Sequence, residues 1–153
     1  SIRSNEEKKE LDNLALGHKK DSLDRFVNAN KFLSSDYTIW LGNRKGPGRV
    51  SSNVFDLLSW DQALYTEKLV SKKTMEEAFF PYILNDKTLS YYGFGWRLNK
   101  DLKNKIVTHS GSNPGYKTRI VRLLDKRKTI IILSNNDFLL EELEDKLSTS
   151  LSI

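Results

Sequence analysis

The 153-residue chain contains no cysteine, one methionine and only two histidines, His18 and His109. The absence of cysteine excludes disulfides, thiolate nucleophiles and zinc–thiolate sites. Two isolated histidines without an H-E-x-x-H motif give no basis for a histidine metal site. The sequence therefore predicts neither a metal nor a cofactor, and it fits either a reducing compartment or an envelope protein that never needed disulfides.

Long apolar runs are also missing. The longest, at 130–133, has the length of a strand and is far below the roughly twenty residues that span a bilayer. Residues 1–10 are polar and charged and show no secretory signal, although a processed or truncated chain would look the same. We expect no membrane span in this chain.

The net charge of +5 is spread along the chain and not concentrated in one patch. Short basic runs occur at 18–20, 100–105 and 125–128, and the last two fall where hairpin turns are expected. Solvated turns explain them, and no nucleic-acid-binding motif accompanies them. We therefore expect no nucleic-acid partner.

The first fifty residues show little regular patterning. The segment 4–7 (SNEE) fits a helix capping box, and 17–36 is polar and irregular. Three glycines and a proline within 41–52 indicate a loop. The sequence predicts an irregular lead-in over 1–50.

Two helices are predicted over 51–90. Ser51 or Ser52 can cap the first helix, which runs to about Tyr65. Its buried face is expected to hold five apolar residues: Val54, Leu57, Leu58, Ala63 and Leu64. Asp56 and Asp61 are interpreted as polar groups of the helix face.

A second, shorter helix is predicted over 72–80. Ser71 can cap it, and Pro81 stops it, because proline cannot continue a helix. A loop is expected to follow to Ser90.

From residue 91 the apolar period changes to two. In 91–98, Phe94, Trp96 and Leu98 share one face of a strand, and Trp96 is interpreted as a core residue. Further strands are predicted at 105–111, 116–124 and 129–134, joined by short turns that make neighbours antiparallel. The fold class is α+β, with an antiparallel sheet of about four strands over 91–134.

A C-terminal helix and the two preceding helices are expected to flank this sheet. Asn136 or Asp137 can cap the final helix. Its apolar face is predicted to comprise Leu139, Leu140, Leu143, Leu147 and Leu151.

The run 130–133 is apolar at consecutive positions, which is typical of a central strand covered on both faces. A central strand needs two neighbours, and 116–124 is the single partner that the sequence offers it. The sheet is expected to be incomplete, and the edge of 129–134 to be prone to pairing with another chain or with a second copy.

Four segments together carry a family resemblance. GPGRVSSNVFDLLSWDQAL (46–64) resembles the Gly-rich turn and helix of the serine β-lactamase and penicillin-binding-protein superfamily, in its class C-like, D-alanyl-D-alanine carboxypeptidase and esterase branch. YYGFGW (91–96) resembles the Y-G-x-G-W strand of that branch, and HSGSNPGY (109–116) resembles its H-x-G-x-x-P-G-[FY] segment. IIILSNN (130–136) resembles its last strand.

The chain departs from the family at the catalytic serine. Members attack with the serine of an S-x-x-K helix and relay protons through Y-x-N or S-x-N; this sequence has no S-x-x-K and no Y-x-N. One S-x-N, at 51–53, lies at a helix start and is interpreted as a cap. Because the family places both elements upstream, the resemblance implies the C-terminal portion of one β-lactamase-like domain, whose missing N-terminal half is the expected partner.

Within that domain, 1–50 is the irregular lead-in, 51–90 is helical, and 91–153 forms the sheet and C-terminal helix. The resemblance implies a serine hydrolase that forms an acyl-enzyme on D-Ala-D-Ala peptides, β-lactams or small esters, in a bacterial periplasm, cell envelope or the exterior. It also implies that this chain is inactive alone. The alternative is a non-catalytic binding or regulatory module of the same fold.

The resemblance also assigns site residues. His109 would replace the lysine of the family's K-[ST]-G strand, and Ser110 would point toward the substrate carboxylate or relay. Gly111 would admit the substrate backbone, and the N–H of Ser112 would donate to the oxyanion. Asn135 is either a substrate ligand or a helix cap, and a single histidine on a half-exposed strand is otherwise an ordinary surface residue.

Overall fold

The computed structural model describes residues 13–33, 50–100 and 105–136, together with 140, 143, 146 and 147. The described residues fall into two compact units. The first contains those up to Ser52, 111–118 and those from 133 onward; the second contains 53–110 and 119–132. The assignment of all 153 residues to one domain stays a prediction.

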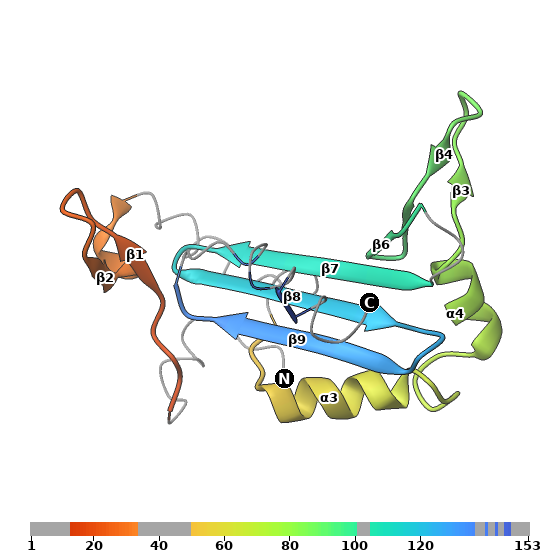
Figure 1. The fold of residues 1–153 in the computed structure, drawn as a ribbon, viewed down its shortest axis with the longest axis horizontal. Helices are drawn as coiled ribbons and strands as arrows, with labels where there is room; N and C mark the ends of the chain where they lie inside the picture. The colour runs from red at the N-terminus through yellow and green to blue at the C-terminus, as the bar shows by residue number, and fades with distance from the viewer. Residues whose placement is uncertain are drawn as a thin grey trace. The chain divides into compact units, whose positions relative to one another are not determined.

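The main sheet has five strands in the order β5-β6-β7-β8-β9. Their bounds are β5 Tyr92–Gly93, β6 Trp96–Leu98, β7 Ile106–Asn113, β8 Tyr116–Leu123 and β9 Lys128–Ser134. In Figure 1 the arrows of β7, β8 and β9 alternate in direction, as short turns require. The α+β class is confirmed, with five strands where the sequence predicted about four.

The fifth strand arises because 91–98 is a hairpin and not one strand. Gly93 pairs with Trp96, and the two residues between them, Phe94 and Gly95, have φ values of 45° and 90°. Positive φ at both central positions is the condition for a type I′ turn. The prediction that Phe94 shares a face with Trp96 is wrong: Phe94 is exposed at the turn, and Trp96 is buried as expected.

Helix α3 (Val54–Ala63) begins one or two residues later than predicted, depending on which serine was the cap, and it ends two residues earlier. Its cap is Asn53, and neither Ser51 nor Ser52. The side-chain oxygen of Asn53 accepts the N–H groups of Phe55 at 2.9 Å and Asp56 at 3.0 Å. The cap therefore satisfies two of the donors that a helix start leaves without partners.

Helix α4 (Lys72–Ala78) is capped by Ser71 as predicted, because the Ser71 hydroxyl accepts the N–H of Thr74, and it ends two residues before the predicted position 80. The loop expected up to Ser90 instead contains a second hairpin, β3 (Tyr82–Ile83) and β4 (Leu89–Ser90). Asp86 closes its turn by accepting the Thr88 N–H at 2.9 Å and hydroxyl at 2.6 Å. Strands of two residues are too short to show an alternating pattern in the sequence.

The lead-in also contains regular structure, which corrects its prediction as irregular. Strands β1 (His18–Lys20) and β2 (Phe26–Asn28) form an antiparallel hairpin, followed by the short 3-10 helix η1 (Ala29–Lys31). The predicted capping box at 4–7 lies outside the described residues, as does 41–49 of the predicted loop. Of the predicted C-terminal helix, Leu143, Lys146 and Leu147 are helical and Leu140 is buried; its other positions lie outside the described residues.

The second unit is built around a buried ion pair. Asp61 on α3 is 0% exposed and Arg122 on β8 is 1% exposed. The Arg122 Nε donates to Asp61 Oδ1 at 2.6 Å, and the Thr129 hydroxyl donates to the same oxygen at 3.0 Å. A charged, hydrogen-bonded contact therefore joins α3 to β8 and β9.

This contact corrects the predicted orientation of α3. The sequence assigned Asp61 to the polar helix face and assigned Val54 and Leu58 to the buried face. In the structure Asp61 is the buried residue of the helix, whereas Val54 and Leu58 are exposed. An aspartate is rarely buried without a counter-charge, and the counter-charge here lies 61 residues along the chain.

Substitution of Asp61 should therefore destabilise the fold strongly. Asp61→Ala is expected to lower the free energy of unfolding by about 3–5 kcal/mol, because Arg122 would remain buried without its partner. Urea denaturation followed by circular dichroism measures the loss. The matched control is Asp56→Ala on the exposed side of the same helix, which should cost about 1 kcal/mol or less. Equal losses for the two variants would contradict this account of the core.

Candidate functional site

His109 on β7 faces Tyr92 on β5 within the second unit. The Tyr92 hydroxyl oxygen lies 3.3 Å from His109 Nε2, and the two ring planes are inclined at 50°. The Arg97 guanidinium carbon on β6 lies 5.9 Å from the centroid of the Tyr92 ring. Both His109 and Tyr92 are exposed, so an imidazole, a phenol and a cation gather at solvent.

The sheet register brings these three strands together. Tyr92 pairs with Arg97, and Arg97 pairs with Thr108, the residue before His109. The tight turn at 94–95 folds β5 back along β6 and places Tyr92 within reach of β7. The sequence reasoning singled out His109 but missed Tyr92 and Arg97. The Y-G-x-G-W motif contains Tyr92 and could have drawn attention to it. The sequence predicted one strand over 91–98, however, and the side chain of Tyr92 reaches His109 only because this segment is a hairpin.

The other predicted site residues lie in different surroundings. Ser110 is exposed on β7 in the second unit, next to His109. Gly111, Ser112 and Asn135 belong to the first unit. The side chain of His109 contacts that of Tyr92. The roles predicted for the five site residues stay predictions; these residues are His109, Ser110, Gly111, Ser112 and Asn135.

Gly111 has a packing reason to be glycine. A Cβ built at this position would collide with the Thr118 Oγ1 on β8. Any larger residue would force β7 and β8 apart or displace the threonine side chain. This packing reason is independent of the predicted approach of a substrate backbone.

Asn135 is tied to the lead-in of the first unit. Its side-chain nitrogen donates to the Leu16 carbonyl at 3.1 Å, and its own carbonyl accepts the His18 N–H at 2.9 Å. Asn135, Asn136, His18 and Phe26 line an open cavity of about 350 Å³. The sequence reasoning gave His18 no role, and the structure makes it part of the wall beside Asn135.

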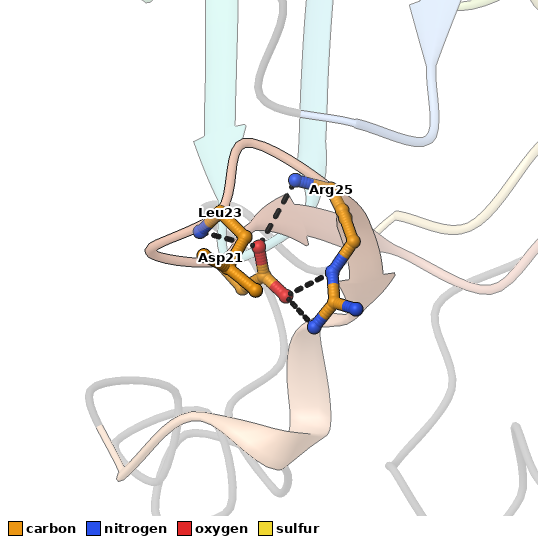
Figure 2. A network of polar contacts seen from close by, with 3 residues as sticks. All are labelled: Asp21, Leu23 and Arg25. Atoms are coloured by element: carbon orange, nitrogen blue, oxygen red, sulfur yellow. Dashed lines mark hydrogen bonds and ion pairs between the residues drawn. The ribbon is translucent and has the colours of Figure 1, made fainter.

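The β1–β2 hairpin supplies two of these wall residues, and Asp21 holds its turn together. Figure 2 shows the Asp21 carboxylate accepting the N–H groups of Leu23 at 2.9 Å and Arg25 at 3.0 Å. The Arg25 guanidinium donates to its other oxygen at 3.0 and 2.8 Å. These bonds favour the ionised carboxylate, so the turn is a charge-dependent element.

This network predicts a pH dependence. The backbone N–H of Arg25 first, and then its guanidinium, hold the pKa of Asp21 below its ordinary value of 3.8. A folded pKa below the unfolded one means that ionised Asp21 stabilises the hairpin above pH 3.8. That stability is lost as the pH falls through the folded value.

Titration of the labelled carboxyl carbon by nuclear magnetic resonance (NMR) should give an Asp21 midpoint below 3.8. Arg25→Ala should raise the midpoint part of the way, because the backbone donor remains. Lys20→Ala, which removes the ion pair with Asp24, is the matched control and should leave the Asp21 midpoint in place. If Arg25→Ala leaves the Asp21 midpoint unchanged, the conclusion that Arg25 lowers the pKa of Asp21 is wrong.

Within 13–33, 50–100 and 105–136, no group of three or more acidic, histidine or cysteine side chains is arranged to hold a metal ion. In the same described ranges, no helix is long and apolar enough to cross a membrane.

The sheet, its flanking helices and the His-Ser-Gly strand together define a β-lactamase- and penicillin-binding-protein-like fold, of which this chain is the C-terminal part. The chain is 40% identical over 129 residues to Penicillin-binding protein 4* of Bacillus subtilis (strain 168), a match covering 83% of this chain and 29% of that protein. Among solved structures it is similar to the octameric penicillin-binding protein homologue from Pyrococcus abyssi, with a TM-score of 0.62 and 23% identity. That match covers 87% of this chain and 29% of the other. No family model matches.

The comparisons confirm the resemblance drawn from the four sequence segments. The chain spans 29% of the length of the Bacillus subtilis protein and 29% of the Pyrococcus abyssi protein, so the activity of a whole protein of this kind is a proposal for this chain.

Proposed function

We propose that this chain is the C-terminal part of a serine hydrolase that forms an acyl-enzyme on D-Ala-D-Ala peptides, β-lactams or small esters. The observation that carries the proposal is the 40% identity to a penicillin-binding protein over 129 residues. An exposed imidazole on the strand that follows the Y-G-x-G-W hairpin supports it. The cell envelope is the proposed location, by the same relationship.

Acyl transfer requires an activated serine, a proton acceptor and donors for the oxyanion. In the proposed site His109 replaces the family's lysine as the hydrogen-bonding or positively charged group beside the substrate, and Ser110 points toward the substrate carboxylate or the proton relay. The Ser112 N–H donates to the oxyanion, Gly111 admits the substrate backbone, and Asn135 binds a polar group of the substrate. The attacking hydroxyl comes from an S-x-x-K element, which these 153 residues do not contain.

A second candidate follows from that missing motif. Without S-x-x-K and Y-x-N, the fold can serve as a binding or regulatory module that holds a peptide or β-lactam without cleaving it. Reversible binding without a covalent adduct is its distinguishing property.

The catalytic proposal is tested with a chimera. In it, this chain replaces the matching segment of the Bacillus subtilis relative, so that the S-x-x-K and Y-x-N elements of that protein are supplied. The chimera should form a covalent adduct with a fluorescent penicillin, visible by intact mass and gel fluorescence. His109→Ala should slow acylation by about 100-fold, the ordinary size of a lost acid–base group.

The control is Tyr82→Ala, at an exposed ring on β3 that has no proposed role in the site, and it should leave the acylation rate within about two-fold of the chimera. Circular dichroism must show that each variant is folded. A folded chimera that only binds penicillin reversibly favours the module. Turnover of nitrocefin by the isolated chain would contradict its proposed inactivity.

We also propose pairing at the outer edge of β9. In the described part of the sheet, β9 is the last strand, and β8 is its neighbour in the strand order. One parallel bridge, between His18 and Asn136, lies just beyond the end of β9. An edge strand presents unpaired backbone donors and acceptors, which favours addition of a further strand from the same domain or from a second copy.

Analytical ultracentrifugation of the isolated chain should therefore show concentration-dependent self-association. Leu133→Lys places a charge on β9, where Leu133 is 40% exposed, and should shift the chain toward the monomer. Leu69→Lys is the matched control, at a leucine of 51% exposure in the segment after α3. A monomer at all concentrations, or equal effects of both variants, would rule out pairing through β9.

A further inference from the structure

We propose that Tyr92 is a positioning residue that fixes the tautomer of His109, so that the imidazole presents its Nδ1–H to the substrate side of the site. This inference rests on the proposed function for its purpose. The tautomer itself is a property of the isolated chain and can be measured without any substrate.

Three features of the second unit hold the Tyr92 backbone in place. The turn at 94–95 closes the hairpin, and the register pairs Tyr92 with Arg97. Gly93 lies directly against the end of α4, where an added Cβ would come within 2.6 Å of the Ala78 carbonyl oxygen. The phenol therefore extends from a backbone that has little freedom to withdraw from β7.

The contact joins the phenol oxygen to one particular nitrogen of the imidazole, Nε2, at 3.3 Å. In neutral histidine one nitrogen carries the proton and the other accepts. A phenol is the natural donor of the pair, and the Arg97 cation lies beside its ring. Donation from Tyr92 into Nε2 leaves the proton on Nδ1.

The tautomer decides on which side of the imidazole ring the N–H donor lies. Free histidine prefers the proton on Nε2, which would point the donor toward Tyr92. With Nε2 occupied by the phenol, the donor lies on the opposite side of the ring, on Nδ1. A lysine needs no such partner, because its ammonium group donates in three directions. A histidine that replaces a lysine needs a second residue to orient its single proton, and Tyr92 fills that role.

The test is long-range ¹H–¹⁵N NMR on the labelled 153-residue chain at a pH where the imidazole is neutral. The chain has two histidines, so His18→Gln assigns the His109 signals. In the native chain, Nδ1 of His109 should resonate as a protonated nitrogen and Nε2 as an unprotonated one. Tyr92→Phe should shift the tautomer ratio toward Nε2–H by about five-fold, the effect of one ordinary hydrogen bond.

The matched control is Tyr82→Phe on the exposed β3 strand, which should leave the ratio unchanged. Backbone amide shifts show whether Tyr92→Phe disturbs the hairpin. If it does, the tautomer of His109 in the native chain is the test, and a dominant Nε2–H tautomer there overturns the inference. An unchanged ratio in folded Tyr92→Phe overturns it even where the chimera acylates penicillin. A changed ratio supports it even where the chimera is inactive, so the two proposals fail separately.

Discussion

The second unit depends on one buried ion pair, between Asp61 of α3 and Arg122 of β8. Removing both charges from water is costly, and their attraction offsets that cost only when the remaining polar atoms find partners. Thr129 supplies a second donor to the carboxylate, whereas Nη1 of Arg122 has no hydrogen-bond partner among the described residues. Around the guanidinium, the rings of Tyr65, Phe79 and Trp96 have centroids at 4.8, 5.7 and 5.5 Å. Their π faces stabilise a cation that water cannot reach.

One of the aromatic residues around Arg122, Trp96, also belongs to the hairpin of the proposed site. Trp96 stacks on Trp60 of α3 with centroids 6.1 Å apart and meets Phe79 edge-on at 6.0 Å. Trp96 is also the first residue of β6, directly after the turn that returns the chain from β5. The same side chain thus packs the core and anchors the hairpin that carries Tyr92. The core around Arg122 and the hairpin that carries Tyr92 therefore share Trp96.

The fold class and the three long strands of the main sheet, β7, β8 and β9, could be predicted from the sequence, because alternation in β8 and consecutive apolar residues in β9 are strong local signals. The same reasoning failed for Asp61, since burial of a carboxylate is decided by an arginine far away in the sequence. It failed at Phe94 because a phenylalanine with positive φ is uncommon and is imposed by the surrounding hairpin. His109 was found through a motif, whereas its partner needed the hairpin geometry. Gly111 was singled out for a substrate, and the structure adds Thr118 as a reason that only coordinates reveal.

The spacing of the buried pair has a consequence for how the chain is made. Helix α3 emerges from the ribosome with its carboxylate, and Arg122 follows 61 residues later. At about 5–20 residues per second, the helix waits roughly 3–12 s for its counter-charge. During that interval α3 has neither its cation nor the sheet to cover its tryptophan, so the nascent chain exposes a surface of the kind that chaperones bind. The ordering of this unit therefore requires the arrival of β8.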